Sequence, residues 1–296
     1  MRIIHSFWSK PCALDANLSI DDRINGGWSS NRYHIYSWVL SCLKALENHR
    51  DVELITDNFG KLLMIDLLKL PYKRVSTELN NLSGYSTDLW ALGKIYSYSI
   101  QKAPFVHIDG DVYLWKSLPT NLMKKNLISQ NIEYNHTYYH EILKEMRLKV
   151  KSLPDFLFEI DYANIVSSNA GIIGGIDYPF FKRFGRCAFD FVDANKTELQ
   201  SLVNPSLSNV IIEQLFFTCL AKVEKKTISY LFNDIDPSYQ QLIEFHRIPS
   251  KTTFTHVVGK NAKRSFAVAK KVELFLQKYY PEYYKKVNKL LNEFQS

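Results

Sequence analysis

Hydrophobic and polar positions along the first third of the chain alternate between strand-like and helix-like patterns. Short, almost continuously apolar segments are separated by longer segments whose apolar residues recur at helical spacing, the first of them with Ser29 or Ser30 as a predicted N-cap. The predicted strands are 1–8, 52–58, 72–79 and 105–109, and the predicted helices are 29–49, 60–70 and 86–101. This order is typical of a mostly parallel sheet with crossover helices.

The second half of the chain continues the alternation with less regular spacing. It contains predicted strands at 127–131, at 167–176, which is bounded by glycines, and at 253–259, and predicted helices at 136–150, from about Pro179, at 209–224 and in the Lys-rich end of the chain. No internal repeat or low-complexity linker interrupts it. We therefore predict one Rossmann-like α/β domain over 1–265, followed by a basic helical extension over 266–296.

Composition fits a globular chain with a sizeable core, because 46% of the 296 residues are hydrophobic. No stretch approaches eighteen consecutive apolar residues, so no transmembrane helix is expected. The first residues are predicted to form a strand rather than a signal peptide. Four scattered cysteines, without metal-ligand spacing, are expected to be buried thiols in a reducing, cytoplasmic setting.

The net charge of +7 is concentrated at the end of the chain. From residue 246 onward there are eleven Lys or Arg and three Glu, a net charge of +8, so the rest of the chain sums to about −1. Nucleic acid is therefore not an expected partner, since no basic field covers the chain. The Tyr- and Lys-rich tail is expected either to cap the domain or to contact an anionic membrane surface.

Two carboxylates, Asp109 and Asp111, lie at the end of the predicted strand at 105–109 and flank Gly110. Side chains alternate along extended backbone, so both carboxylates point to the same side, with room between them at the glycine. Hard oxygen ligands of this kind suit Mg²⁺ or Mn²⁺, and a diphosphate can complete the coordination. The alternative is an ordinary turn with solvated acids.

Three segments in order along the chain resemble GT-A-fold glycosyltransferases of the glycogenin-like and bacterial galactosyltransferase-like group. They are the Asp-x-Asp segment HIDGDVYLWKSLP, the segment SSNAGIIGG at 167–175, and the late segment FTHVVGKNAKR at 254–264. The resemblance implies a metal-dependent enzyme that transfers a sugar from a nucleotide-sugar, here a UDP-sugar, to a hydroxyl acceptor, with retention at the anomeric carbon.

In that group the late histidine is the third protein ligand of the metal, a role that falls here on His256. Gly259 would let the backbone approach phosphate, and Lys260 and Lys263 would neutralise charge on the leaving nucleoside diphosphate. The group usually places its phosphate lysine three residues after the glycine, where this chain has Ala262. Which lysine serves is therefore open, and so is the plain alternative that His256 is an ordinary surface histidine.

Other positions receive roles through the resemblance. Small residues at 169–171 would line the donor-sugar pocket, a basic residue before the Asp strand would reach the donor, and polar residues of the apolar helix would face the reactive carbon. Structural roles compete with each of these: a tight turn, a solvated helix face and a core-edge carboxylate. The residues concerned are Asn169, Ala170, Gly171, Lys94, Glu213 and Gln214.

The end of the first strand and the end of the second would face the nucleoside in this fold. These residues are His5, Ser6 and Phe7, and Asp57; an aromatic ring there would stack on the base, or would simply belong to the core. No GxxxxGK[ST] loop and no GxGxxG after a strand is present, which removes the main support for P-loop and dinucleotide-dependent enzymes.

The sequence therefore predicts a GT-A-type glycosyltransferase that uses Mn²⁺ or Mg²⁺ and acts in bacterial-type glycan or glycoconjugate synthesis. Its acceptor would be a glycan, a lipid-linked molecule or a peptide. Two alternatives stay open at this point: a nucleotidyltransferase acting on sugar phosphates, and a catalytically degenerate protein that binds a glycan or partner.

Overall fold

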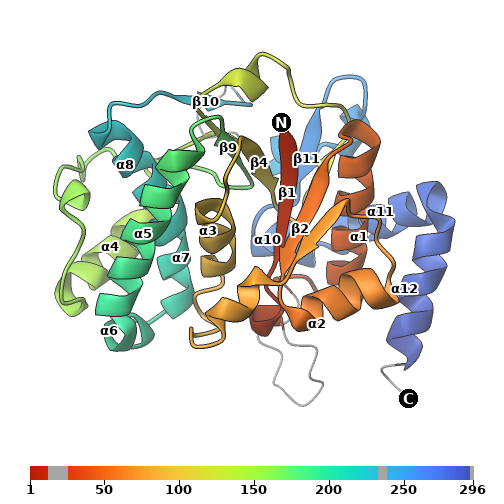
Figure 1. The fold of residues 1–296 in the computed structure, drawn as a ribbon, viewed down its shortest axis with the longest axis horizontal. Helices are drawn as coiled ribbons and strands as arrows, with labels where there is room; N and C mark the ends of the chain where they lie inside the picture. The colour runs from red at the N-terminus through yellow and green to blue at the C-terminus, as the bar shows by residue number, and fades with distance from the viewer. Residues whose placement is uncertain (13–25, 233–238, 294–296) are drawn as a thin grey trace. The chain divides into compact units, whose positions relative to one another are not determined.

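The computed structural model describes residues 1–12, 26–232 and 239–293, which form an α/β protein (Figure 1). Its contacts divide the chain into two compact units that are discontinuous in sequence. Unit 1 comprises 81–107 and 119–237 together with Met1, and unit 2 comprises 2–80, 108–118 and 238–296. The boundary predicted at residue 265 stays a prediction, although residues on both sides of it belong to unit 2.

Seven strands belong to one mostly parallel sheet, as predicted. Unit 1 provides the order β10-β6-β9-β4 and unit 2 the order β1-β2-β3. The pairs β1–β2, β2–β3 and β6–β10 are parallel, whereas β6–β9 is antiparallel. The strands are β1 Arg2–Phe7, β2 Val52–Thr56, β3 Arg74–Ser76, β4 Phe105–Ile108, β6 Leu127–Ser129, β9 Ile172–Gly175 and β10 Ile228–Tyr230.

In unit 2 the strands β1 and β2 are buried along almost their whole length, which explains their apolar sequences. Helix α1 packs against α11 and α12 and against β5, which pairs antiparallel with β11. Ser30 occupies the N-cap position of α1 without a side-chain cap bond. The elements are α1 Asn31–Asn48, α2 Asn58–Lys61 continued by a π-helix at Leu62–Leu67, β5 Val112–Leu114, α9 Tyr239–Leu242, β11 Phe254–His256, α10 Gly259–Arg264, α11 Phe266–Tyr279 and α12 Pro281–Glu293.

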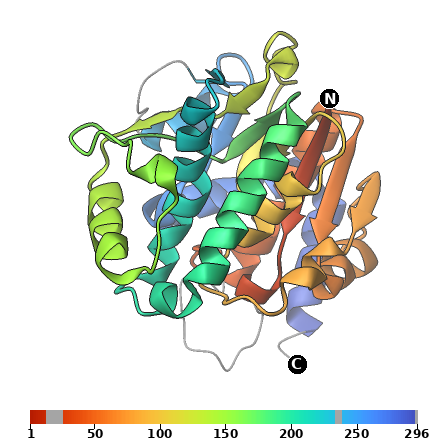
Figure 2. The same cartoon turned by 60° about the vertical axis from the view of Figure 1, so that its left-hand side comes forward.

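In unit 1 the helices α3 and α5 lie side by side (Figures 1 and 2). A second small pairing joins β7 and β8 antiparallel. The elements are α3 Leu92–Ser99, β7 Ile132–Tyr134, α4 Thr137–Lys149, β8 Val166–Ser168, α5 Tyr178–Ala194, α6 Lys196–Gln200, α7 Ser208–Val210, a π-helix at Ile211–Leu215 and α8 Phe216–Val223.

Two predicted elements of unit 1 differ from those observed. The helix predicted over 86–101 is reduced to α3, because Ser86 accepts from the Asp88 N–H and Asn209 bonds the backbone at Asp88 and Ala91. These side-chain bonds offer the backbone an alternative to the helical ladder. The single strand predicted over 167–176 is two strands, β8 and β9, separated by a turn at 169–171.

One described helical segment, Pro205–Val223, is long and apolar enough to cross a membrane by length and composition. Of its most apolar window, 67% is buried inside the protein, which favours a core helix. Among the cysteines, Cys42 and Cys219 are buried and Cys187 is half-buried, all three as free thiols. The side chain of Cys12 lies outside the described residues.

Candidate functional site

Three groups that can ligate a metal lie together in unit 2. Asp109 and Asp111 belong to the turn that precedes β5, and His256 ends β11, where it pairs with Val112. One ligand atom of each of the three side chains lies within 4.8 Å of the others. The structure thus brings together the three residues that the sequence proposed as metal ligands.

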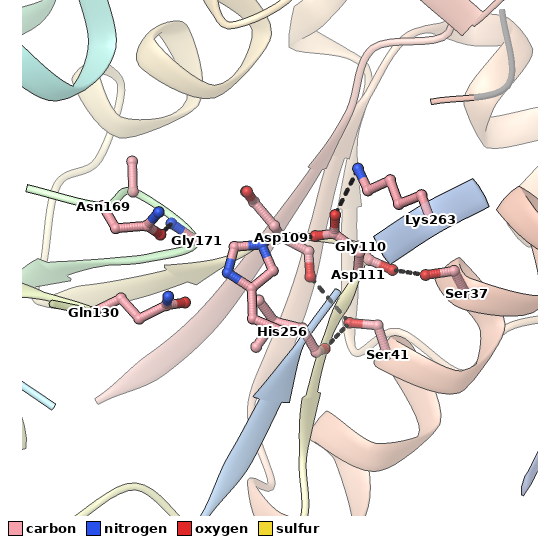
Figure 3. A network of polar contacts seen from close by, with 12 residues as sticks. Ser37, Ser41, Asp109, Gly110, Asp111, Gln130, Asn169, Gly171, His256 and Lys263 are labelled. Atoms are coloured by element: carbon pink, nitrogen blue, oxygen red, sulfur yellow. Dashed lines mark hydrogen bonds and ion pairs between the residues drawn. The ribbon is translucent and has the colours of Figure 1, made fainter. Parts of the chain in front are cut away.

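Helix α1 fixes the backbone of this turn (Figure 3). The Ser37 hydroxyl donates to the Gly110 carbonyl at 2.7 Å, and the Ser41 hydroxyl donates to the Val112 carbonyl at 2.7 Å. A Cβ added to Gly110 would lie 2.3 Å from the Trp38 ring. Gly110 is therefore needed because an indole packs against it, and its predicted place beside a bound ligand stays a prediction.

Lys263 sets the electrostatics of the cluster. Its Nζ lies 2.7 Å from Asp111 Oδ2, and His256 Nε2 lies 3.4 Å from Asp111 Oδ1. Burial alone would raise the pKa of the Asp111 carboxyl, but the Lys263 ammonium and the contact with His256 outweigh it, and the pKa falls below its usual range. Asp111 is therefore ionised and ready to act as a ligand.

The donor set fits a divalent metal of the Mg²⁺ or Mn²⁺ type. Two carboxylates supply hard oxygens, and the His256 imidazole is a ligand that Mn²⁺ accepts beside carboxylate. Asp111 and His256 are 9% and 4% exposed, while Asp109 is half-buried, which leaves one carboxylate open toward a ligand. Lys263 also donates to the Gly26 carbonyl at 3.0 Å, so its ammonium is held in place from two sides.

The two lysines of the late segment, Lys260 and Lys263, lie in different surroundings. Gly259 begins α10 with a φ of +78°, a conformation that favours glycine, and Lys260 is exposed. Lys263, one turn further along, reaches the carboxylate cluster. Ala262, which stands where the resembling group has its lysine, is 9% exposed and faces inward. The geometry favours Lys263 over Lys260 as the cation beside the cluster.

The end of the first strand is a buried polar core. His5 is fully buried, with Nδ1 2.8 Å from the Tyr72 hydroxyl and Nε2 3.2 Å from the Ser41 hydroxyl. Burial lowers the pKa of His5 to about 3, so it is neutral. Phe7 is 4% exposed, and its ring meets the Trp38 ring edge-on at 5.0 Å. Together with Ser6, which is 8% exposed, these side chains are core positions, and nucleoside contact by them stays a prediction.

The Asp57 carboxylate is fully engaged in hydrogen bonds within the protein. Its carboxylate accepts from the Ser9 N–H and hydroxyl, each at 2.8 Å, and from the Gly60 N–H at 2.8 Å. As the N-cap of α2 it satisfies an orphan donor of the first turn. Its predicted contact with a nucleoside also stays a prediction.

In unit 1 the predicted sugar-pocket segment is the turn between β8 and β9. Asn169 donates to Glu133 Oε1 at 2.7 Å and accepts from the Gly171 N–H at 3.0 Å, so its amide is used within the protein. Glu133 is buried and also accepts from the Tyr139 hydroxyl at 2.7 Å. Sequence reasoning missed Glu133, whose only signal was a carboxylate in the short segment IEY.

A buried ion pair joins α3 to the π-helix at Ile211–Leu215. Lys94 Nζ lies 2.9 Å from Glu213 Oε1 and 3.3 Å from the Ala170 carbonyl, and the Tyr98 hydroxyl donates to Glu213 at 2.7 Å. The Glu213 side chain is 3% exposed. Lys94 and Glu213, which the sequence proposed separately, are thus one pair. Tyr98, four residues after Lys94, was missed although the helical spacing places both on one face.

Gln214 follows in the same π-helix and is half-buried. Its buried Oε1 has no hydrogen-bond partner among the described residues. An amide oxygen in this state retains acceptor capacity for a ligand hydroxyl. The structure therefore leaves Gln214 chemically available, whereas Glu213 is already paired.

Similar folds occur among solved structures. The galactosyltransferase LgtC in complex with donor and acceptor sugar analogs matches with a TM-score of 0.45 and 11% identity, covering 92% of this chain and 94% of that chain. The glycosyltransferase GlyE of Streptococcus pneumoniae TIGR4 matches with a TM-score of 0.46 and 10% identity, covering 99% of this chain and 63% of that chain. An active-site mutant of LgtC matches with a TM-score of 0.40 and 12% identity, covering 88% of each chain.

At these identities and TM-scores, nothing about the donor, the acceptor or the reaction of this chain follows from the likeness. No curated protein matches the sequence. A family model does match, over residues 1–290 and so over nearly the whole chain. The chain belongs to the family DUF6734, which is described as a family of unknown function.

Proposed function

We propose that this chain is a metal-dependent glycosyltransferase that moves a sugar from a UDP-sugar to an acceptor hydroxyl. The observation that carries the proposal is the convergence of Asp109, Asp111 and His256 within 4.8 Å, with Lys263 beside them. Two carboxylates, an imidazole and an ammonium are a set suited to a metal and a diphosphate rather than to a solvated turn.

Asp109, Asp111 and His256 would hold the Mn²⁺ or Mg²⁺ ion. When bound, such an ion supplies Lewis-acid stabilisation to the departing diphosphate. Lys263 carries its charge 2.7 Å from Asp111, where the negative charge of a leaving nucleoside diphosphate would develop. Ser37 and Ser41 hold the turn by its carbonyls, which keeps both carboxylates oriented before a donor arrives.

The roles of the polar groups in unit 1 rest on the sequence resemblance. Gln214 has an acceptor oxygen without a partner among the described residues, which suits a sugar hydroxyl, and Lys94 keeps the Glu213 carboxylate compensated by an opposite charge. We propose retention at the anomeric carbon; in an inverting enzyme Glu213 would instead be the base for the acceptor hydroxyl. Proton NMR of the first-formed product decides this, and an inverted anomer would overturn retention.

The proposed acceptor is a glycan, a lipid-linked molecule or a peptide, met in the cytoplasm. The Lys-rich helices α11 and α12 add a proposed contact with anionic membrane surfaces, since basic and aromatic side chains favour that interface. Co-sedimentation with phosphatidylserine vesicles, compared with neutral vesicles, measures this contact separately from catalysis.

The test of the function is a panel of nucleotide-sugars scored for metal-dependent hydrolysis and transfer. We expect activity with one or a few UDP-sugars in Mn²⁺ or Mg²⁺, loss of it with EDTA, and loss of it in Asp111→Asn. The matched control is Glu282→Gln, whose carboxylate is 83% exposed on α12.

Two further assays, with a nucleoside triphosphate and a sugar phosphate as substrates and with the melting temperature as readout, separate the two alternatives. Release of pyrophosphate from a nucleoside triphosphate and a sugar phosphate would show a nucleotidyltransferase. Failure of every donor, together with no effect of Mn²⁺ and UDP on the melting temperature, would leave a binding protein and refute the transferase.

A further inference from the structure

Unit 1 contains a cavity with a volume of about 370 Å³ that the proposed donor chemistry does not use. It lies along α3 and α5, which run side by side in both ribbon views (Figures 1 and 2). Its lining residues all belong to unit 1, whereas Asp109, Asp111 and His256 belong to unit 2. Its volume falls in the range of small-molecule pockets.

The floor of the cavity is formed where α3 and α5 touch. A Cβ on Gly185 of α5 would lie 2.4 Å from Cβ of Ser99 on α3. A side chain at position 185 is therefore incompatible with this helix spacing. The cavity is thus bounded by a close helix contact and by the segment 81–85, which precedes α3.

Three aromatic rings form one wall. The Phe189 ring meets the Tyr85 ring at 5.5 Å and the Tyr96 ring at 6.0 Å, both edge-on. Each tyrosine is held by its hydroxyl, since Tyr85 donates to Asp193 and Tyr96 accepts from the Asn81 amide. The wall is a fixed apolar surface with hydrogen-bonding groups at its edges.

Two cations on α5, Lys182 and Arg186, also line the cavity. They are four residues apart on one helix, so their side chains are neighbours, and both are exposed. Other cations nearby are paired: Arg183 with Glu224 at 2.6 Å, and Lys196 with Asp193 at 2.9 Å. Among the described residues, neither Lys182 nor Arg186 forms an ion pair.

We infer that this cavity binds a sugar phosphate. A guanidinium and an ammonium one turn apart can share the oxygens of one phosphate, with Arg186 donating two parallel bonds and Lys182 acting as a point charge. The C–H face of a sugar ring then packs on the aromatic wall. Inorganic phosphate leaves the wall without a partner, and a neutral sugar leaves both cations without an anion.

The inference does not depend on the proposed transferase activity, and its experiment needs neither metal nor nucleotide. Binding of glucose 1-phosphate, inorganic phosphate and methyl glucoside is measured by isothermal titration and by NMR in EDTA. We expect glucose 1-phosphate to bind more tightly than inorganic phosphate, and methyl glucoside not to bind. Lys182→Ala should weaken glucose 1-phosphate binding about tenfold, the effect of losing one charge-assisted contact, and Arg186→Ala should weaken it by more than tenfold, because two such bonds are lost.

Two control variants locate the binding. Lys144→Ala removes an exposed lysine of α4, a helix of unit 1 that does not line this cavity, and should leave affinity unchanged. Asp111→Asn alters the acidic cluster and should also leave it unchanged. The inference is overturned if wild type does not bind glucose 1-phosphate, if Lys182→Ala and Arg186→Ala bind as wild type does, or if Asp111→Asn abolishes binding.

Discussion

Replacing Lys94 by Met should destabilise unit 1 strongly, because it removes the cation that lies 2.9 Å from the buried Glu213 carboxylate. The two side chains are 12% and 3% exposed, so water screens the pair little. Removing one partner of such a pair costs about 3–5 kcal/mol. The Tyr98 hydroxyl remains as a donor to Glu213 and offsets only part of this cost.

The second variant, Glu213→Gln, keeps an acceptor for Tyr98 and removes the negative charge. The double variant Lys94→Met/Glu213→Gln should recover most of the stability lost in Lys94→Met, because no uncompensated buried charge remains. Unfolding in urea, followed by far-UV circular dichroism at pH 7, gives the free energies. Hydrogen exchange of residues 92–99 reports the same change locally in α3.

A cost below about 1 kcal/mol for Lys94→Met would place this pair among weakly coupled, solvated pairs and refute the reasoning. Strict additivity of the two single substitutions would refute it as well, since coupled neighbours deviate from additivity by about 0.5–3 kcal/mol. Either result would show that Glu213 is not held mainly by a stabilising ion pair, and would favour a direct role for Glu213 in the reaction.

Three further predictions concern the surroundings of the acidic cluster. Gly110→Ala should lower the melting temperature and weaken Mn²⁺ binding, because its Cβ would lie 2.3 Å from the Trp38 ring; unchanged calorimetric and binding values would contradict this. The His5 pKa of about 3 in the folded protein lies below the unfolded value of 6.5, so between pH 7 and pH 5 only the unfolded chain takes up a proton at this residue. The free energy of unfolding should therefore fall by about 2 kcal/mol over that range through His5. In His5→Gln, the pH dependence of urea unfolding should be weaker by about that amount. Lys263→Met should raise the pKa of Asp111 toward its ordinary value. In wild type the depressed pKa stabilises the folded protein above about pH 4, and this stabilisation is lost as the pH falls; in the variant the loss should be smaller. An unchanged acid-unfolding profile would refute the Lys263 contribution.

The order of strands and helices in the first third could be predicted from the sequence because its first two strands, β1 and β2, are buried along almost their whole length, whereas β3 has Arg74 exposed and Val75 and Ser76 half-buried. The segment IIHSF of β1 and the segment VELIT of β2 are apolar for that reason, and the crossover helices between them carry a clear helical period. The metal candidates could also be predicted, but the geometric reason was wrong: Asp109 and Asp111 lie in a turn, in which the Val112 N–H donates to the Asp109 carbonyl at 3.0 Å, and not on extended backbone.

Long-range contacts could not be predicted. The pairing of Lys94 with Glu213 joins residues 119 positions apart, and the partners of Asn169 and His5 likewise come from distant segments. The periodicity of a segment predicts which of its residues are buried, but not which distant residues they contact. The reason for Gly110, a ring of α1 packed on the turn, is of the same kind.

The boundary errors are caused by side-chain hydrogen bonds to the backbone, one set local and one from a distant residue. The chain before α3 is apolar enough to continue the helix, but side-chain bonds from Ser86 and Asn209 capture its backbone groups. In the segment 167–176, Asn169 accepts from the Gly171 N–H and closes a turn that splits the predicted strand. Ser and Asn side chains often bond backbone groups in this way, and the sequence does not tell which of these bonds form.

The most direct test of the central claim is thermal unfolding of wild type and Asp111→Asn with UDP, in the presence and absence of Mn²⁺. Wild type with Mn²⁺ and UDP at about 100 times the dissociation constant should gain about 2.7 kcal/mol of stability, and this gain should require the metal. Asp111→Asn should show no gain, while Glu282→Gln behaves as wild type. A wild-type protein whose melting temperature ignores Mn²⁺ and UDP, or an Asp111→Asn variant that responds as wild type does, would contradict the account.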